Sequence, residues 1–340
     1  MNFIECVPNF SEGRDPEKIK KITDAIETVH DVRVLHVHSN ETANRTVITF
    51  AGHERIIGEA AFRAIQTASE VIDMSTHTGA HPRIGATDVC PFIPLGNTSM
   101  ETCVHIARSL GNRVAEKLNI PVYLYEKAAS SPERSNLANL RKGGYEGLAE
   151  RMKYPEWVPD FGPPVPHPAA GATVIGARPF LIALNMNLNT NNLLVAKRIA
   201  RQIRTSGFEK TLPDGKKMHH PGFFPACKAI GWFMPQWGIV QISVNLTDYK
   251  TTPPHKVFEM CKKMARRFHV EVTGSELIGL IPLDAMLAAG RYYIREKHLY
   301  EMDEESLIHA AIKGLGLHDL DLFDPRERIL EYRLKELDKG

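Results

Sequence analysis

The chain has 340 residues, of which 43% are hydrophobic and 24% are charged, a composition typical of a folded globular protein. With 42 basic and 40 acidic residues its net charge is +2, too small to favour nucleic acid or an anionic membrane as a partner. No apolar segment approaches the roughly 20 residues of a membrane helix, and we expect no signal peptide. The length predicts two domains, and five widely spaced cysteines predict buried, reduced thiols in a cytoplasmic protein.

The first half of the chain predicts alternating strands and helices. Asp15 and Pro16 are suited to be the N-cap and first residue of a helix, and apolar side chains at 19, 22 and 26 give that helix one buried face. Two β-branched runs around a polar turn at 39–44 predict a hairpin. The predicted order is a strand at 3–8, this first helix, strands at 32–37 and 45–50, a helix through 57–72, a strand at 88–95, a helix capped by Thr98, and a strand at 122–125.

The second half repeats this order. Its predicted elements are a strand at 179–188, a helix at 192–205, strands at 228–233 and 238–245, a helix from 254, and a strand within 273–283. Segments 85–95 and 273–283 both end in Ile-Pro-Leu, at equivalent places in the two halves. We therefore predict an α/β (α+β) protein with two similar subdomains, 1–178 and 179–340. Each is expected to be a ferredoxin-like βαββαβ sandwich, related to the other by an internal repeat, with extra helices at the C-terminus.

His81 is the strongest candidate for chemistry. It lies between Gly79 and Pro82, on a loop just before a predicted buried strand, where general acid–base residues are often found. The alternative is a surface or packing role, which most of the fifteen histidines must have.

A proline-rich segment at 154–172 separates the two repeated halves. Its six prolines and two glycines are typical of a stiff linker. Because ligand sites often lie between domains, the same segment is also suited to form the wall of a cleft. We assign it to the first subdomain.

Long stretches of this chain resemble glutamate formiminotransferase, the formiminotransferase unit of formiminotransferase-cyclodeaminase. The resemblance runs from residue 3 to residue 333 and includes no cyclodeaminase unit. The matching stretches are Glu5-Cys-Val-Pro-Asn-Phe-Ser-Glu-Gly13, Asn44-Arg-Thr-Val47, Ile72-Asp-Met-Ser75, His81-Pro-Arg83, Asp88-Val-Cys-Pro-Phe-Ile-Pro94, Pro121-Val-Tyr-Leu-Tyr125, Pro159-Asp-Phe-Gly-Pro163, Gly171-Ala-Thr-Val174, Gly176-Ala-Arg178 and Pro325-Arg-Glu-Arg-Ile329.

The resemblance implies transfer of the formimino group of N-formimino-L-glutamate to N5 of tetrahydrofolate, with release of L-glutamate, in histidine degradation. It also implies a cytoplasmic homodimer, a folate site between the subdomains, and a functional link to a separate formiminotetrahydrofolate cyclodeaminase. His81 matches the family's catalytic histidine. The implied folate-binding residues are Gly162, Pro163, Pro164, Val165, Pro166, His167, Pro168, Ala169, Ala170 and Gly171.

This chemistry suits a single histidine. The folate nitrogen must lose a proton as it attacks the amidine carbon, and the departing glutamate amine must gain one. One imidazole with a pKa near ~6.5 can do both in turn. We therefore expect His81 to be the general base and acid, tetrahydrofolate to be a co-substrate, and no metal to be needed.

Both substrates carry carboxylates, which arginine side chains bind well. We expect two of Arg45, Arg83 and Arg178 to bind them, the alternative for each being a surface ion pair.

Polar residues on the turn after the first strand are further candidates for binding carboxylates, because this turn leads into a helix N-terminus. They are Asn9, Ser11 and Glu12. Local turn or cap hydrogen bonding is the alternative for Ser11. Asn185 and Asn187 lie two apart on a strand and are candidates for the amide edge of the pterin; the alternative is a pair of sheet-edge asparagines bonded to nearby loops.

The chain departs from the family pattern at His38, where the resemblance implies an acidic residue near the catalytic histidine. A carboxylate there would orient the imidazole and raise its pKa, whereas a histidine does only the first. We expect His38 to be a neighbour of His81.

Other classes of function remain as alternatives. His36, His38, His77 and His81, with the pair at 219–220, offer ligands for a metal-dependent hydrolase. Gly79 and Pro82 argue against 77 and 81 sharing a helical face. A non-catalytic folate-binding protein is a further alternative, whereas an RNA-binding module would need a basic surface and exposed aromatics. Residues 213–222 predict a long polar hairpin loop, either solvated or attractive to a polyglutamate tail.

Overall fold

The structure, a computed structural model, describes residues 2–294 and 302–335. The chain divides into two compact units, the first ending at Pro179 and the second running from Phe180 to Arg333, with Leu334 and Lys335 grouped with the first. All five cysteines are buried and free. Among the described residues, no helix combines the length and apolar character needed to cross a membrane.

A seven-stranded sheet forms the centre of the first unit. Across the sheet, the strands are β3 (Val32–Asn40), β4 (Arg45–His53), β1 (Phe3–Cys6) together with β2 (Asn9–Phe10), β5 (Thr87–Pro94), β7 (Thr173–Ala177) and β6 (Val122–Glu126). β1 and β2 both lie between β4 and β5, so the predicted first strand is present but interrupted at Val7 and Pro8. β7 pairs with β5 and β6 in parallel and widens the sheet.

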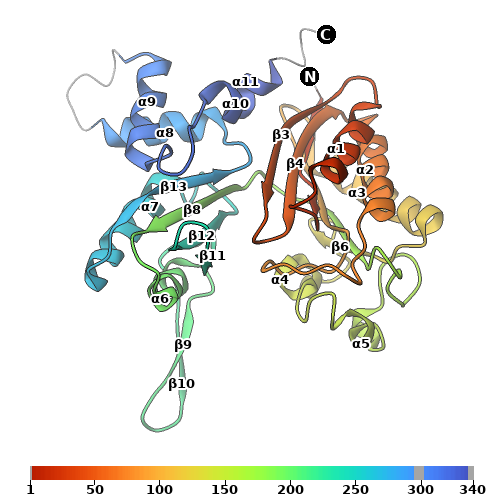
Figure 1. Cartoon of the computed structure of the whole chain (residues 1–340), viewed down its shortest axis with the longest axis horizontal. Helices are drawn as coiled ribbons and strands as arrows, with labels where there is room; N and C mark the ends of the chain where they lie inside the picture. The colour runs from red at the N-terminus through yellow and green to blue at the C-terminus, as the bar shows by residue number, and fades with distance from the viewer. Residues whose placement is uncertain (1, 295–301, 336–340) are drawn as a thin grey trace. The chain divides into compact units, whose positions relative to one another are not determined.

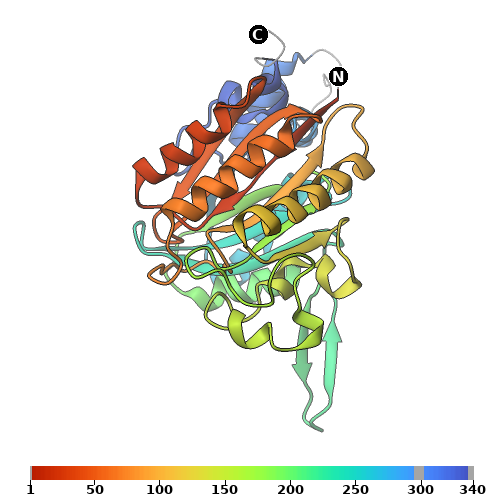
Figure 2. The same ribbon diagram turned by 90° about the vertical axis from the view of Figure 1, so that its right-hand side faces the viewer.

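Three helices pack side by side on one face of this sheet (Figure 1 and Figure 2). They are α1 (Pro16–Glu27), α2 (Ile57–Val71) and α3 (Met100–Leu118). α1 begins as predicted, because the Asp15 carboxylate accepts hydrogen bonds from the N–H groups of Glu17 and Lys18. Ile22 and Ile26 point from α1 into the core and are fully buried, which stabilises the unit by roughly 1.5–3 kcal/mol each.

The predicted N-cap of α3 is wrong by one residue. The Ser99 side chain accepts the hydrogen bond from the N–H of Thr102, as an N-cap must. The Thr98 hydroxyl instead donates to the carbonyl oxygen of Phe3, 95 residues away. Thr98 and Ser99 are equally suitable as N-caps by residue type. Ser99 is the N-cap because the Thr98 hydroxyl is used in the long-range bond to Phe3.

Residues 127–172 form short elements between β6 and β7. They are η1 (Pro132–Ser135), α4 (Leu137–Leu140), α5 (Leu148–Arg151) and η2 (Pro155–Trp157). Leu140, Leu148 and Met152 from this region form a second buried cluster with Val89 and Tyr123 of the sheet. The linker alternative for the proline-rich segment is wrong, because the chain returns from it into β7 inside the first sheet.

The second unit repeats the strand order of the first. Its core elements are β8 (Ile182–Leu188), α6 (Leu193–Ile203), β11 (Cys227–Met234), β12 (Ile239–Leu246), α7 (Pro254–Ala265) and β13 (Val272–Ile278). The antiparallel order β11-β12-β8-β13 corresponds to β3-β4-β1-β5 of the first unit. The repeat seen in the sequence therefore appears as a repeated order of strands.

Elements outside this repeat complete the second unit. They are the 3-10 turn η3 (Arg266–Phe268) and the helices α8 (Leu283–Tyr293), α9 (Glu304–Leu315), α10 (Pro325–Arg328) and α11 (Leu330–Leu334). The polar hairpin loop predicted at 213–222 lies in a β-hairpin whose two strands, β9 (Phe208–Thr211) and β10 (Lys217–His220), pair antiparallel and project from the unit (Figure 1).

Candidate active site

His81 lies on the irregular loop between α2 and β5, with both ring nitrogens engaged. Nη1 of Arg45 is 2.5 Å from Nε2 of His81, and Nδ1 is 2.7 Å from the carbonyl oxygen of Pro82. Because a guanidinium can only donate, Nε2 accepts, and Nδ1 must carry the proton that it donates to Pro82. His81 is therefore a neutral imidazole whose lone pair points at Arg45.

A second arginine, which sequence analysis did not single out, belongs to the same cluster. Arg141, at the end of α4, forms an ion pair with the carboxylate of Asp88. Asp88 is only 1% exposed and also accepts a 3.0 Å hydrogen bond from the N–H of Ile84 in the His81 loop. The positive charge of Arg141 acts on both Arg45 and His81.

The electrostatic surroundings keep His81 neutral. Burial and the charges of Arg45 and Arg141 hold the pKa of His81 well below its ordinary value of 6.5. Burial and Arg141 also lower the pKa of Arg45 to about 10, although Asp88 opposes this shift. An imidazole with a lowered pKa is unprotonated at neutral pH, the form that a base needs, and once protonated it gives the proton up readily.

His77 and Arg83 hold the loop that carries His81. Nε of Arg83 donates to Nδ1 of His77 at 3.1 Å, so Nε2 of His77 carries the proton and donates to the carbonyl oxygen of Asn44 at 3.0 Å. Arg83 also bonds both carboxylate oxygens of Glu146, at 2.6 and 3.0 Å. Its guanidinium, a predicted carboxylate ligand, is thus bound within the protein itself.

Asn44 links three segments around Arg45. Its backbone is in the left-handed region, with φ of 47°, a conformation that asparagine tolerates. The side-chain oxygen accepts from the N–H of Gly13, and the side-chain amide donates to the carbonyl of Thr78, both at 2.9 Å. These bonds fix the start of β4, from which Arg45 projects.

The predicted folate segment, residues 162–171, packs against the His81 loop. The N–H of Ala86 donates to the carbonyl oxygen of Ala170, and the N–H of Met74 donates to that of Ala169. Gly85 permits this approach, because a Cβ atom at that position would lie 2.0 Å from the carbonyl oxygen of Ala172. The structure therefore brings together two motifs that lie far apart in the sequence.

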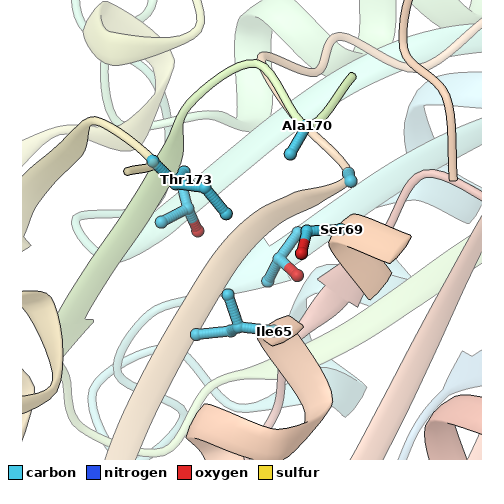
Figure 3. A pocket seen from close by; sticks show the side chains of 7 residues that line it. Ile65, Ser69, Ala170 and Thr173 are labelled. Atoms are coloured by element: carbon cyan, nitrogen blue, oxygen red, sulfur yellow. The ribbon is translucent and has the colours of Figure 1, made fainter. Parts of the chain in front are cut away.

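The two ends of this segment differ in exposure. Ala170 is buried, and with Thr173 it faces Ile65 and Ser69 of α2 across a gap that has no room for a water molecule (Figure 3). Val165, in contrast, is 58% exposed. Residues 162–168 are therefore the part of the segment that is accessible to a ligand.

The predicted residues of the first turn make internal hydrogen bonds. The Ser11 hydroxyl, 2% exposed, donates to the carbonyl oxygen of Gly85 at 2.7 Å and so ties this turn to the base of the His81 loop. The Glu12 carboxylate accepts from the N–H groups of the two residues at the α1 cap, 14 and 15. The Asn9 side chain donates to the carbonyl of Val7.

The structure places His38 on β3 and Arg178 directly after β7. His38 is opposite Val47, and Asn40 is opposite Arg45, in the antiparallel pair β3 and β4. Because opposed residues share a face, His38 projects from the same face as Arg45, one row away. Arg178 donates to the carbonyl oxygen of Pro179 and lies beside the Tyr125 hydroxyl.

Asn185 and Asn187 share a face of β8, as their spacing predicts, but β8 is an interior strand and not an edge. Asn187 is fully buried; its amide nitrogen donates to Asp319 and its oxygen accepts from Gln241, both at 2.8 Å. Asn185 donates to Glu276. Both asparagines thus belong to a partly buried network of amides and carboxylates, in which Asp319 is exposed.

The histidines suggested as metal ligands do not form one centre. Across residues 2–294 and 302–335, no three His, Cys, Asp or Glu side chains are grouped so that they could hold a metal ion. His36 and His38 stack on each other, with ring centroids 6.3 Å apart, while His77 and His81 have the separate partners described above. Residues 219 and 220 lie on β10 in the second unit.

Comparison with known proteins identifies the family. The family model of the formiminotransferase domain, N-terminal subdomain, matches residues 3–178, and that of the formiminotransferase domain matches residues 183–335. The chain is 46% identical to the glutamate formimidoyltransferase of Thermoplasma acidophilum, over 92% of this chain and 98% of that protein. It is 41% identical to the protein of the same name from Streptococcus pyogenes, over 86% of this chain and 93% of that protein.

A longer relative matches equally well. The chain is 46% identical to the formimidoyltransferase-cyclodeaminase of Mus musculus, over 97% of this chain but 59% of that protein. The chain thus spans about three-fifths of the length of that relative. The domain matches and the nearly full-length relatives together show that the chain belongs to the formiminotransferase family.

Proposed function

We propose that this chain is a glutamate formimidoyltransferase, which moves the formimino group of N-formimino-L-glutamate to N5 of tetrahydrofolate and releases L-glutamate, in histidine degradation. The observation that carries the proposal is the neutral His81, with its lone pair on Arg45, on a loop packed against residues 162–171. The relatives named glutamate formimidoyltransferase, which the chain matches along nearly their whole length, support it.

In this proposal His81 is the catalytic residue and moves one proton twice. As N5 attacks the amidine carbon, a carbon–nitrogen bond forms and the proton of N5 passes to Nε2 of His81. As the bond to the glutamate nitrogen breaks, the imidazolium returns the proton to the departing amine. Holding both substrates in place supplies much of the rate, roughly 7–11 kcal/mol in favourable cases.

The accessible stretch 162–168 is our proposed contact for tetrahydrofolate, a co-substrate, and no step of this mechanism needs a metal. We propose Arg45 as one carboxylate ligand and His38 as a neighbour of the pair formed by Arg45 and His81. The internal bonds of Arg83 and Ser11 favour a positioning role for both residues. Asn9, Glu12, Arg178, Asn185 and Asn187 stay predicted contacts of the substrates.

The proposal extends to partners and location. We propose a cytoplasmic homodimer that works with a separate formiminotetrahydrofolate cyclodeaminase. β11 is an edge strand carrying Ile230, 52% exposed, and Phe233, 40% exposed, and such an edge is a template for pairing with another copy. Light scattering should give twice the chain mass of 38.1 kDa, and Ile230→Lys with Phe233→Lys should reduce it to that of one chain.

The test of the function is turnover of N-formimino-L-glutamate with tetrahydrofolate. His81→Ala should lower kcat by at least ~100-fold, because it removes the group that moves the proton. His30→Ala is the matched control, since the His30 side chain is 93% exposed. Equal turnover by wild type and His81→Ala would overturn the assignment of His81, and a wild type that does not turn over would overturn the function.

A further inference from the structure

Two guanidinium groups share one carboxylate beside His81. Asp88 is paired with Arg141 and also lies near Arg45, whose own side-chain hydrogen bond goes to the neutral His81 ring. The three charged groups, Arg45, Arg141 and Asp88, therefore carry a net charge of +1. Two like charges held together in a partly buried place are costly unless an anion joins them.

Arg141 also has an unused donor in this cluster. Its Nε atom is buried and makes no hydrogen bond to any described residue, although the side chain as a whole is 15% exposed. A buried donor left without a partner is unfavourable, because it has given up its hydrogen bond to water. Asp88 accepts from Nη2 of this guanidinium, and the other oxygen of Asp88 accepts from the N–H of Ile84.

We infer that Arg141 and Arg45 form an anion site that takes a carboxylate of the formimino donor, and that Asp88 positions Arg141 for this contact. The inference rests on the proposed function, whose donor carries two carboxylates. Planar guanidinium groups match a carboxylate with two parallel hydrogen bonds, so both the excess charge and the spare donor are satisfied.

The same contact exposes the catalytic lone pair. In the structure Nη1 of Arg45 donates a hydrogen bond to Nε2 of His81, the nitrogen that must accept the proton. A carboxylate is a stronger partner for Arg45 than a neutral imidazole, because the hydrogen bond is then charged at both ends. Binding of the donor therefore draws Arg45 away and leaves Nε2 free, so His81 becomes a base only when the donor is present.

The test is binding of glutarate and of L-glutamate to the whole chain without folate, measured by titration calorimetry. We expect Arg141→Gln to weaken both ligands at least ~10-fold, Asp88→Asn to weaken them as well, and Arg141→Lys to restore part of the affinity. The matched control is Arg134→Gln, which breaks the ion pair of Arg134 with Asp160, 2.8 Å apart and about equally buried. Thermal melting checks that each variant is folded.

A second readout separates the anion site from a merely structural role. Glutarate should raise the pKa of His81, followed by its ring-proton NMR signal, in wild type and not in Arg141→Gln. Glutarate that fails to bind wild type, or that binds Arg141→Gln as tightly as wild type, overturns the inference. The two proposals can fail separately. If glutarate binding depends on Arg141 but the wild type transfers no formimino group, only the proposed function is rejected. If the wild type transfers the group but Arg141→Gln binds glutarate with unchanged affinity, only the anion site is rejected.

Discussion

The guanidinium of Arg45 donates a hydrogen bond to Nε2 of His81, the one ring nitrogen with a free lone pair, with Nη1 2.5 Å from Nε2. This contact has two effects at once. The positive charge disfavours the imidazolium, so the ring stays neutral, and the hydrogen bond covers the nitrogen that would accept a proton. His81 is thereby kept in the correct protonation state for a base, with its reactive nitrogen covered until Arg45 finds another partner.

The pH dependence of kcat/KM should follow from the lowered pKa of His81. The neutral ring is the active form, so activity is lost as pH falls through this pKa, and the acid limb should lie below 6.5. Arg141→Gln removes one positive charge and should move the limb upward, towards 6.5, whereas Arg134→Gln should leave it in place. An acid limb at or above 6.5 in the wild type would contradict this electrostatic account.

Gly171→Ala should disturb the contact between the folate segment and the His81 loop. Gly171 has φ of +69°, and a Cβ atom there would lie 2.4 Å from the carbonyl oxygen of Ile84. Gly215→Ala is the control, because Gly215 has φ of +80° but nothing within 4 Å of the added atom. Both variants carry a conformational cost of about 1–2 kcal/mol. Only Gly171→Ala should also weaken tetrahydrofolate binding, measured by fluorescence titration, and equal affinities in the two variants would reject the proposed role of the segment.

Ser11→Ala should lower the free energy of unfolding by about 1–2 kcal/mol, because it leaves the buried carbonyl of Gly85 without its hydrogen bond. Ser135→Ala removes an exposed hydroxyl that bonds a carbonyl three residues away and should cost less than ~0.5 kcal/mol. Urea unfolding curves measure both. A Ser11→Ala protein of wild-type stability with a raised KM for the donor would instead make Ser11 a substrate ligand.

Asn187→Ala should destabilise the second unit. It removes two hydrogen bonds at a fully buried position, although Gln241 keeps Glu276 and Asp319 keeps Thr273 as partners, so we expect a loss of about 1–3 kcal/mol. Asn112→Ala, which removes an exposed amide bonded to Glu116, should have little effect on the thermal melting temperature. Similar melting temperatures for both variants would show that the network does not stabilise this unit.

The order of elements was accessible from sequence because it depends on local periodicity. Apolar spacings of three and four mark α1 and α2, and alternating β-branched runs mark β3 and β4. β7 was missed because it is a five-residue strand after a proline-rich segment, and its place between β5 and β6 depends on long-range parallel pairing. The same limit explains why Thr98 was chosen over Ser99.

The candidate site was only partly predictable. His81 and Arg45 lie in recognisable motifs, and the spacing of Asn185 and Asn187 correctly places them on one face. Arg141 carries no local signal, since it lies in a region of short helical turns and its partner Asp88 is 53 residues away. Such contacts arise only when the chain between β6 and β7 folds back over the sheet.

The most direct test of the proposed function follows the formimino carbon itself. N-formimino-L-glutamate labelled with carbon-13 in the formimino group would be incubated with tetrahydrofolate and chelator-treated protein, and the label would be followed by NMR. We expect the label to move to the folate as L-glutamate is released, in wild type and not in His81→Ala. Label that appears in formamide or formate, without a folate adduct, would contradict it and point to a hydrolase.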